Sequence, residues 1–81
     1  MRVDKFLKNS RIIKRRQVAK EACENERVTI NGNIAKPGSE VNEGDIIEIV
    51  FGKSNLKVKV TNILEVANKS NAEEMYEVID G

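Results

Sequence analysis

Residues 1–20 read MRVDKFLKNSRIIKRRQVAK and combine the two patterns that decide the fold. They hold eight basic residues and one acidic residue, a net charge of +7 in a chain whose total is +1. Apolar residues lie between the charges, so this segment predicts two short helices with buried faces and not a solvated basic tail. The basic residues are Arg2, Lys5, Lys8, Arg11, Lys14, Arg15, Arg16 and Lys20.

The two predicted helices are short and closely joined. The first has Asp4 as its N-cap, because Asp accepts hydrogen bonds from the free N–H groups of a first turn, and it ends near residues 9–10. Ile12 and Ile13 then enter the core, and a second helix covers residues 14–24. Its apolar face is expected to consist of Val18, Ala19, Ala22 and Cys23.

After Asn25 the apolar period changes from helical to alternating, which predicts a small, mainly antiparallel twisted sheet. Asn31-Gly32 indicates a type I′ hairpin, because both residues tolerate positive φ. A single helical turn is expected at residues 72–75. Strands are predicted at residues 27–30, 33–35, 46–51, 56–66 and 76–79, the last at an edge. Helices followed by a sheet give an α+β fold.

The length and composition argue against an enzyme. The 81 residues predict one domain over residues 1–81, a small frame for an active site built from several loops. The absence of His removes the commonest general base and metal ligand. Cys23, the single cysteine, lies on an apolar helix face and is interpreted as a core residue, not as a nucleophile. We therefore expect no catalytic residue, cofactor or metal.

The N-terminal charges do not fit a signal peptide, and no apolar run is long enough to cross a bilayer. A lone cysteine excludes an internal disulfide. These features predict a soluble cytoplasmic protein with no membrane partner.

The near-neutral total hides a charge asymmetry. Residues 1–36 have a net charge of +6 and residues 37–81 a net charge of −5. Because the helices are closely joined, the cations of residues 5–16 are expected to converge, and such a cluster repels itself unless it binds a polyanion. A solvated face is the alternative for any charged run. A rigid Arg and Lys cluster, with no stacking platform or recognition helix, favours folded RNA over DNA.

Five spaced blocks of sequence resemble the S-four RNA-binding domain, named for the fourth small-subunit ribosomal protein. The blocks are RVDKFL at 2–7, SR at 10–11, RRxxAK at 15–20, RVxING at 27–32 and VxxGDxI at 41–47. The resemblance implies an RNA-binding core over residues 1–51, with two helices packed on a small sheet (the alpha-L motif), and a C-terminal strand extension over residues 52–81. Glu26 stands where the domain usually has Gly, so Asn25 is the candidate for a left-handed residue there.

Over its whole length the chain is similar to the stand-alone bacterial RqcP (YabO) family of ribosome-associated quality control. The similarity implies binding to an obstructed large ribosomal subunit that carries peptidyl-tRNA, beside the tailing factor RqcH. It implies contacts with rRNA and tRNA and support of C-terminal alanine addition, by a protein expected to be a monomer off the ribosome. The RNA-facing surface is assigned to the eight basic residues above, and Asp4 is expected to cap the helix or to orient an arginine.

Three other hypotheses stay open at this point. One is a large-subunit rescue factor like heat shock protein fifteen, although the tail after Val66 is short and acidic where that protein has a basic extension. Another is the RNA-targeting subunit of a separate rRNA-modifying enzyme. The third is a protein-interaction module whose basic face contacts an acidic protein.

Overall fold

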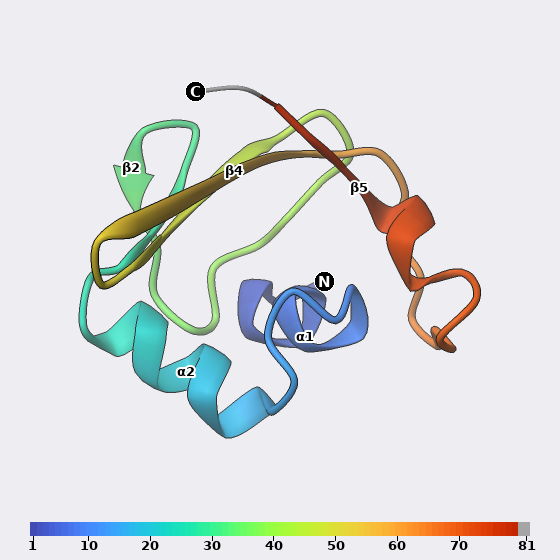
Figure 1. Ribbon diagram of the computed structural model, residues 1–81, viewed down its shortest axis with the longest axis horizontal. Helices are drawn as coiled ribbons and strands as arrows, with labels where there is room; N and C mark the ends of the chain where they lie inside the picture. The colour runs from blue at the N-terminus through green and yellow to red at the C-terminus, as the bar shows by residue number, and fades with distance from the viewer. Residues whose placement is uncertain (80–81) are drawn as a thin grey trace.

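The computed structural model of the chain describes residues 1–79 and has two α-helices on one face of a five-stranded antiparallel sheet (Figure 1). This confirms the predicted α+β fold. Asp80 and Gly81, which close the predicted extension, lie outside the described residues. The elements are α1 (Val3–Asn9), α2 (Arg16–Glu24), β1 (Val28–Ile30), β2 (Asn33–Ile34), β3 (Ile46–Phe51), β4 (Ser54–Val60), the 3-10 turn η1 (Ala72–Met75) and β5 (Tyr76–Val78).

Helix α1 begins without a side-chain cap, so the prediction that Asp4 is the N-cap is wrong. The N-cap position belongs to Arg2, and Asp4 lies inside the first turn. The free N–H groups of that turn are bound by a distant loop: Val3 N donates to Ser39 O at 2.8 Å, and Asp4 N donates to Pro37 O at 3.3 Å. Because backbone carbonyls satisfy these donors, the helix needs no capping side chain.

Each helix is followed, directly after its C-cap, by a residue in the left-handed conformation. Glu26 has a φ of 60° and Arg11 a φ of 63°, whereas Asn25 has a φ of −88°. The expectation for Asn25 is therefore wrong. After α2 the N–H of Glu26 donates to Cys23 O and that of Arg27 to Ala22 O, the two bonds of a Schellman motif, which place the left-handed residue one position after the C-cap.

The sheet has the strand order β2-β1-β3-β4-β5, with β5 at an edge as predicted. Asn31 and Gly32 both have positive φ, which confirms the type I′ hairpin between β1 and β2. Strand β4 runs from Ser54 to Val60 and not over residues 56–66. The chain leaves the sheet after Val60 because the next N–H, that of Thr61, donates to Met75 O in η1 at 2.9 Å.

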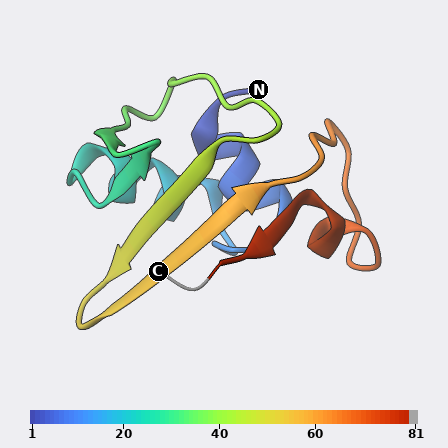
Figure 2. The same ribbon diagram turned by 90° about the horizontal axis from the view of Figure 1, so that it is seen from above.

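The core lies between the helices and one face of the sheet. Figure 2 shows β3, β4 and β5 side by side, with the helices behind them. Ile13 is buried and Ile12 partly buried, as predicted. On the predicted apolar face of α2, Val18 is 47% exposed and does not belong to the core. Residues that are fully buried in this core include Phe6, Leu7, Ile47, Ile49, Val58 and Val60.

The covered face and the open face of the sheet differ in composition. On the open face, Glu48 pairs in register with Lys57, and Lys59 with Glu77. Opposite charges at facing positions stabilise neighbouring strands modestly and suit a solvated surface. No helix within residues 1–79 combines the length and the apolar character that crossing a membrane requires.

Candidate RNA interface

A buried carboxylate at the start of α1 binds two arginines. Arg2 Nη2 donates to Asp4 Oδ2 at 3.1 Å, and Arg16 Nη2 donates to Asp4 Oδ1 at 3.4 Å. The Asp4 side chain is 3% exposed, whereas those of Arg2 and Arg16 are 52% and 48% exposed. Each guanidinium has five N–H donors, so both arginines keep donors that face solvent. Of the two roles expected for Asp4, the structure shows the orientation of arginines.

The backbone around this carboxylate is held from several directions. Arg2 forms an isolated antiparallel bridge with Glu40, and Val41 N donates to Met1 O at 2.9 Å. Asp4 Oδ1 also accepts the N–H of Lys5 at 2.7 Å. A carboxylate in the first turn of a helix is favoured by the partial positive charge of the free N–H groups. We call Arg2, Asp4 and Arg16 the arginine clamp.

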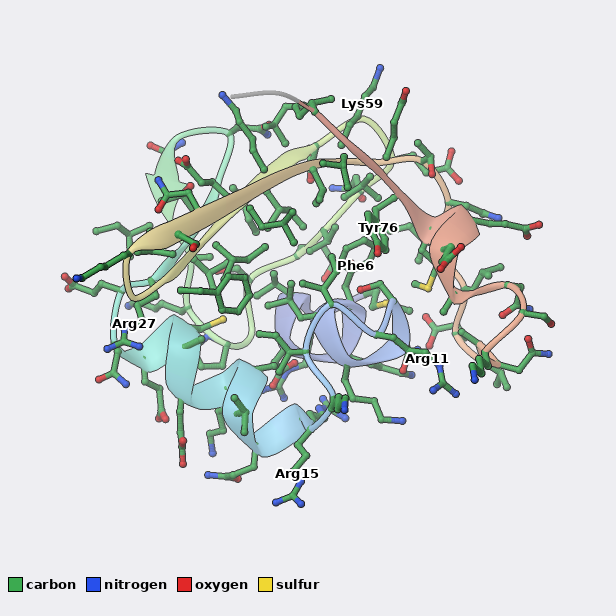
Figure 3. All side chains as sticks on the ribbon, viewed as in Figure 1. Phe6, Arg11, Arg15, Arg27, Lys59 and Tyr76 are labelled. Carbon is green, nitrogen blue, oxygen red and sulfur yellow. The ribbon has the colours of Figure 1, made fainter. Side chains whose placement is uncertain are left out.

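A second basic group lies at the other end of α1, around a hollow of about 360 Å³. The side chains of Lys8, Arg11 and Lys14 are exposed and line this hollow together with Asn9 and Ala67. Figure 3 shows Arg11 on the side of α1 that faces the loop before η1. Arg11 takes this place because the left-handed turn after α1 reverses the chain direction there. We call this feature the basic hollow.

The loop of residues 61–71 is fixed against α1 by contacts that the sequence did not predict. Asn9 Nδ2 donates to Leu64 O and to Glu65 O, both at 3.1 Å. Lys5 Nζ lies 2.6 Å from Glu65 Oε2, and this hydrogen bond lowers the pKa of the Glu65 carboxyl. A local sequence pattern could not predict these contacts, because the partners lie far apart in the chain. As a result, Lys5 has an acidic partner within the protein.

The two other predicted site residues lie outside both groups. Arg15 is the exposed N-cap residue of α2, and its side chain projects away from the molecule (Figure 3). Lys20 is exposed one helical turn after Arg16. The six cations of residues 5–16 that were expected to converge are therefore divided: Arg16 belongs to the clamp, Lys8, Arg11 and Lys14 line the hollow, and Lys5 and Arg15 lie outside both groups.

The described residues offer fixed hydrogen-bond donors and little reactive chemistry. No group of three or more His, Cys, Asp or Glu side chains that could hold a metal ion occurs within residues 1–79. Cys23 is 2% exposed, and burial, with Asp4 and Glu24 as minor causes, raises the pKa of its thiol to about 11. Such a thiol is protonated at neutral pH and is a poor nucleophile.

Comparison with known proteins places this geometry in a family. The family model of the S4 domain, which is the S-four domain named above, matches residues 1–47. An RQC P-site tRNA stabilizing factor from Halalkalibacterium halodurans is 54% identical over 78 residues, which cover 96% of this chain and 89% of that protein. The chain belongs to this RqcP family. A second RqcP protein, from Listeria monocytogenes, is 49% identical over 98% of this chain and 86% of its own length.

The chain also shares its fold with a solved structure of another S4-like protein. The trimeric structure of Vibrio cholerae heat shock protein 15 superposes with a TM-score of 0.90 at 28% identity, over 98% of this chain and 81% of that chain. The S4 match ends inside β3, at residue 47. The cations of the clamp and of the hollow thus lie within the matched segment, whereas Ala67, which also lines the hollow, lies beyond it.

Proposed function

We propose that this protein is a non-catalytic RNA-binding factor of ribosome-associated quality control that acts in the cytoplasm. It binds the obstructed large ribosomal subunit and contacts both rRNA and peptidyl-tRNA. The observation that carries this proposal is the arginine clamp, found in a chain whose relatives are named P-site tRNA stabilizing factors. All eight basic residues of the segment 1–20 are assigned to the RNA-facing surface.

The arginine clamp suits a shaped phosphate backbone. Arg2 and Arg16 are held by Asp4 before any RNA arrives, so binding orders fewer side chains and loses less conformational entropy. Their free donors can take a phosphate in a bidentate manner. Folded RNA is recognised largely through such backbone geometry.

Two basic groups at the ends of α1 favour a factor that bridges two RNA segments. A helix of seven residues is about 10 Å long, so the clamp and the hollow can engage different strands at once. Simultaneous contacts raise the effective affinity without new interactions. In this proposal the protein stabilises peptidyl-tRNA on the large subunit by touching both RNAs, and an RqcH-like factor carries out alanine tailing.

A rescue factor like heat shock protein 15 is the second candidate, because the fold likeness to that protein is high. Sequence identity favours the first candidate: it is 54% with the relative from Halalkalibacterium halodurans and 28% with the heat shock protein 15 of Vibrio cholerae. The proposal predicts a monomer off the ribosome, whereas that structure is trimeric. Analytical ultracentrifugation of the purified chain tests the monomer directly.

Co-sedimentation with purified large subunits tests the site. Arg2→Ala or Arg16→Ala should lose co-sedimentation while the thermal unfolding transition stays close to that of the wild type. Lys59→Ala removes the same charge from the exposed open face of the sheet, where Figure 3 shows Lys59, and should bind normally. About five phosphate contacts should give a log–log salt slope of roughly −4. Full co-sedimentation of both arginine variants, or a flat salt response, contradicts the assignment.

Affinity purification from cells tests the pathway. The tagged wild-type chain should recover free large subunits with peptidyl-tRNA and an RqcH-like protein, and ribonuclease treatment should release them. Cells without the protein should lose alanine tails on stalled chains. Recovery of subunits with unchanged tailing in the deletion strain would instead support the rescue factor.

A further inference from the structure

The basic hollow is a concave site at the end of α1. Its volume of about 360 Å³ falls at the lower end of the range for sites that hold small organic ligands. Its walls come from three parts of the chain: the end of α1, the connection to α2 and the loop at residues 61–71. A continuous helical strand cannot enter such a hollow, whereas a nucleotide turned out of the stack can.

The cations of the hollow have no acidic partners within the described chain. The ion pairs found in residues 1–79 involve the Met1 amino group, the two clamp arginines and Lys5. Lys8, Arg11 and Lys14 are exposed and take part in none of these pairs. Three like charges around one hollow repel one another and favour a bound anion.

The hollow lies at the C-terminal end of a helix, where the helix dipole opposes an anion. The carbonyls concerned are already occupied: Leu7 O accepts from Ile13 N, and Lys8 O accepts from Arg11 N, both at 3.0 Å. Helix α1 has only seven residues, so three full positive charges outweigh its partial negative end.

The far wall of the hollow is held in place before any ligand arrives. The two bonds from Asn9 fix the carbonyls of Leu64 and Glu65, and the Lys5–Glu65 pair holds the same loop. Ala67 follows two residues later and contributes a small apolar surface to the wall. The hollow thus joins an anion-binding side to a fixed apolar side, which is the combination that a phosphate with its attached ribose and base requires.

We propose that the basic hollow binds one unstacked nucleotide of RNA, with its phosphate on Lys8, Arg11 and Lys14 and its ribose or base against Ala67. This inference rests on the proposed function and assigns a residue outside the S4 match to RNA recognition. The nucleotide belongs to the large-subunit rRNA or to the bound tRNA, and the experiment below separates these sources.

A bulky side chain in the hollow gives the first test, with purified large subunits carrying peptidyl-tRNA as the probe. Ala67→Trp leaves every charge unchanged but fills the hollow, and it should raise the Kd at least about tenfold, the effect of losing one charge-assisted contact. Asn55→Trp introduces the same side chain at an exposed position in β4 and should bind like the wild type. Circular dichroism verifies that both variants are folded.

Site-directed crosslinking gives the second test and does not depend on affinity. A photoactivatable label on Ala67→Cys should crosslink to an unpaired nucleotide, and sequencing of the adduct identifies rRNA or tRNA. Glu77→Cys in β5 serves as the control and should give no RNA adduct. Cys23 is buried and its thiol pKa is about 11, so labelling is confined to the introduced cysteine.

The outcomes separate this inference from the proposed function. If the wild type fails to bind subunits, the proposed function fails. If the wild type binds, Arg2→Ala abolishes binding, and Ala67→Trp binds normally with no adduct at position 67, the proposed function stands and the nucleotide site is overturned. An adduct only to base-paired nucleotides also contradicts the site.

Discussion

Arg2 and Arg16 contact the two oxygens of one buried carboxylate, that of Asp4, at 3.1 and 3.4 Å. Arg2 precedes α1 and Arg16 begins α2, so the shared carboxylate ties the two helices together as well as orienting two guanidinium groups. The two guanidinium groups of the arginine clamp are therefore oriented by one buried negative charge.

Removing the negative charge of Asp4 tests whether RNA binding depends on oriented arginines or only on the total positive charge. Asp4→Asn raises the net charge from +1 to +2. If the total charge governed binding, affinity for large subunits would rise. We expect it to fall about tenfold, because two arginines lose their fixed positions. The loss of stability should be small, about 1 kcal/mol, since both guanidiniums remain half-exposed to water. Filter binding and thermal denaturation measure both quantities, and tighter binding contradicts the clamp.

Arg11 should show opposite effects on stability and on binding. Its φ of 63° is unfavourable for any residue with a Cβ, so Arg11→Gly should stabilise the fold by about 0.5–1 kcal/mol. The same variant removes a cation from the basic hollow and should weaken subunit binding about tenfold. Urea denaturation and co-sedimentation on one preparation check the two signs. A variant that is more stable and binds equally well would place Arg11 outside the RNA contact.

Glu26 has the same backbone conformation away from the basic groups. Glu26→Gly should also stabilise the protein by about 0.5–1 kcal/mol, with unchanged binding to large subunits. Glu24→Gly is the matched control, because position 24 is right-handed and helical, where Gly destabilises by up to about 1 kcal/mol. Equal destabilisation by both changes in urea would contradict the left-handed assignment.

Cys23 gives a prediction for alkaline pH. Its thiol pKa is raised from 9.0 to about 11 in the folded protein, so the unfolded chain loses this proton first as the pH rises. The contribution to stability is therefore fully present below pH 9 and falls between pH 9 and 11, by up to about 3 kcal/mol. Urea denaturation across this range, compared with Cys23→Ala, isolates the effect. Equal pH slopes for both proteins would show that the thiol ionises freely in the fold.

Much of the sheet could be predicted from local sequence. Strand β3 and the Asn31-Gly32 turn have the boundaries expected, because β-propensity and tolerance of positive φ are properties of a few neighbouring residues. The predicted end of β4 was wrong. Apolar residues continue past Val60 in the sequence, but the backbone N–H of Thr61 donates to Met75 O instead of to a neighbouring strand. A local sequence pattern does not show which distant carbonyl will accept a given backbone N–H.

The positions of the left-handed residues could not be predicted from residue type and were set by the backbone hydrogen bonds at the helix ends. The sequence indicated that a special conformation was needed near residues 25–26, but the register of the Schellman bonds placed it on Glu26. An Arg at the equivalent position after α1 carries no sequence signal at all, because arginine has no preference for positive φ.

By itself, the sequence determined that this chain has two short helices, a small antiparallel sheet and an excess of positive charge at one end, since helical and strand periods and formal charges are local properties. Only the tertiary structure decided which cations are held and which are free. The buried Asp4 binds two arginines from different parts of the fold. The loop at residues 61–71 contacts α1 through the hydrogen bonds of Asn9 and the ion pair of Lys5. Such contacts form because the core brings these groups together, and no short stretch of sequence records that proximity.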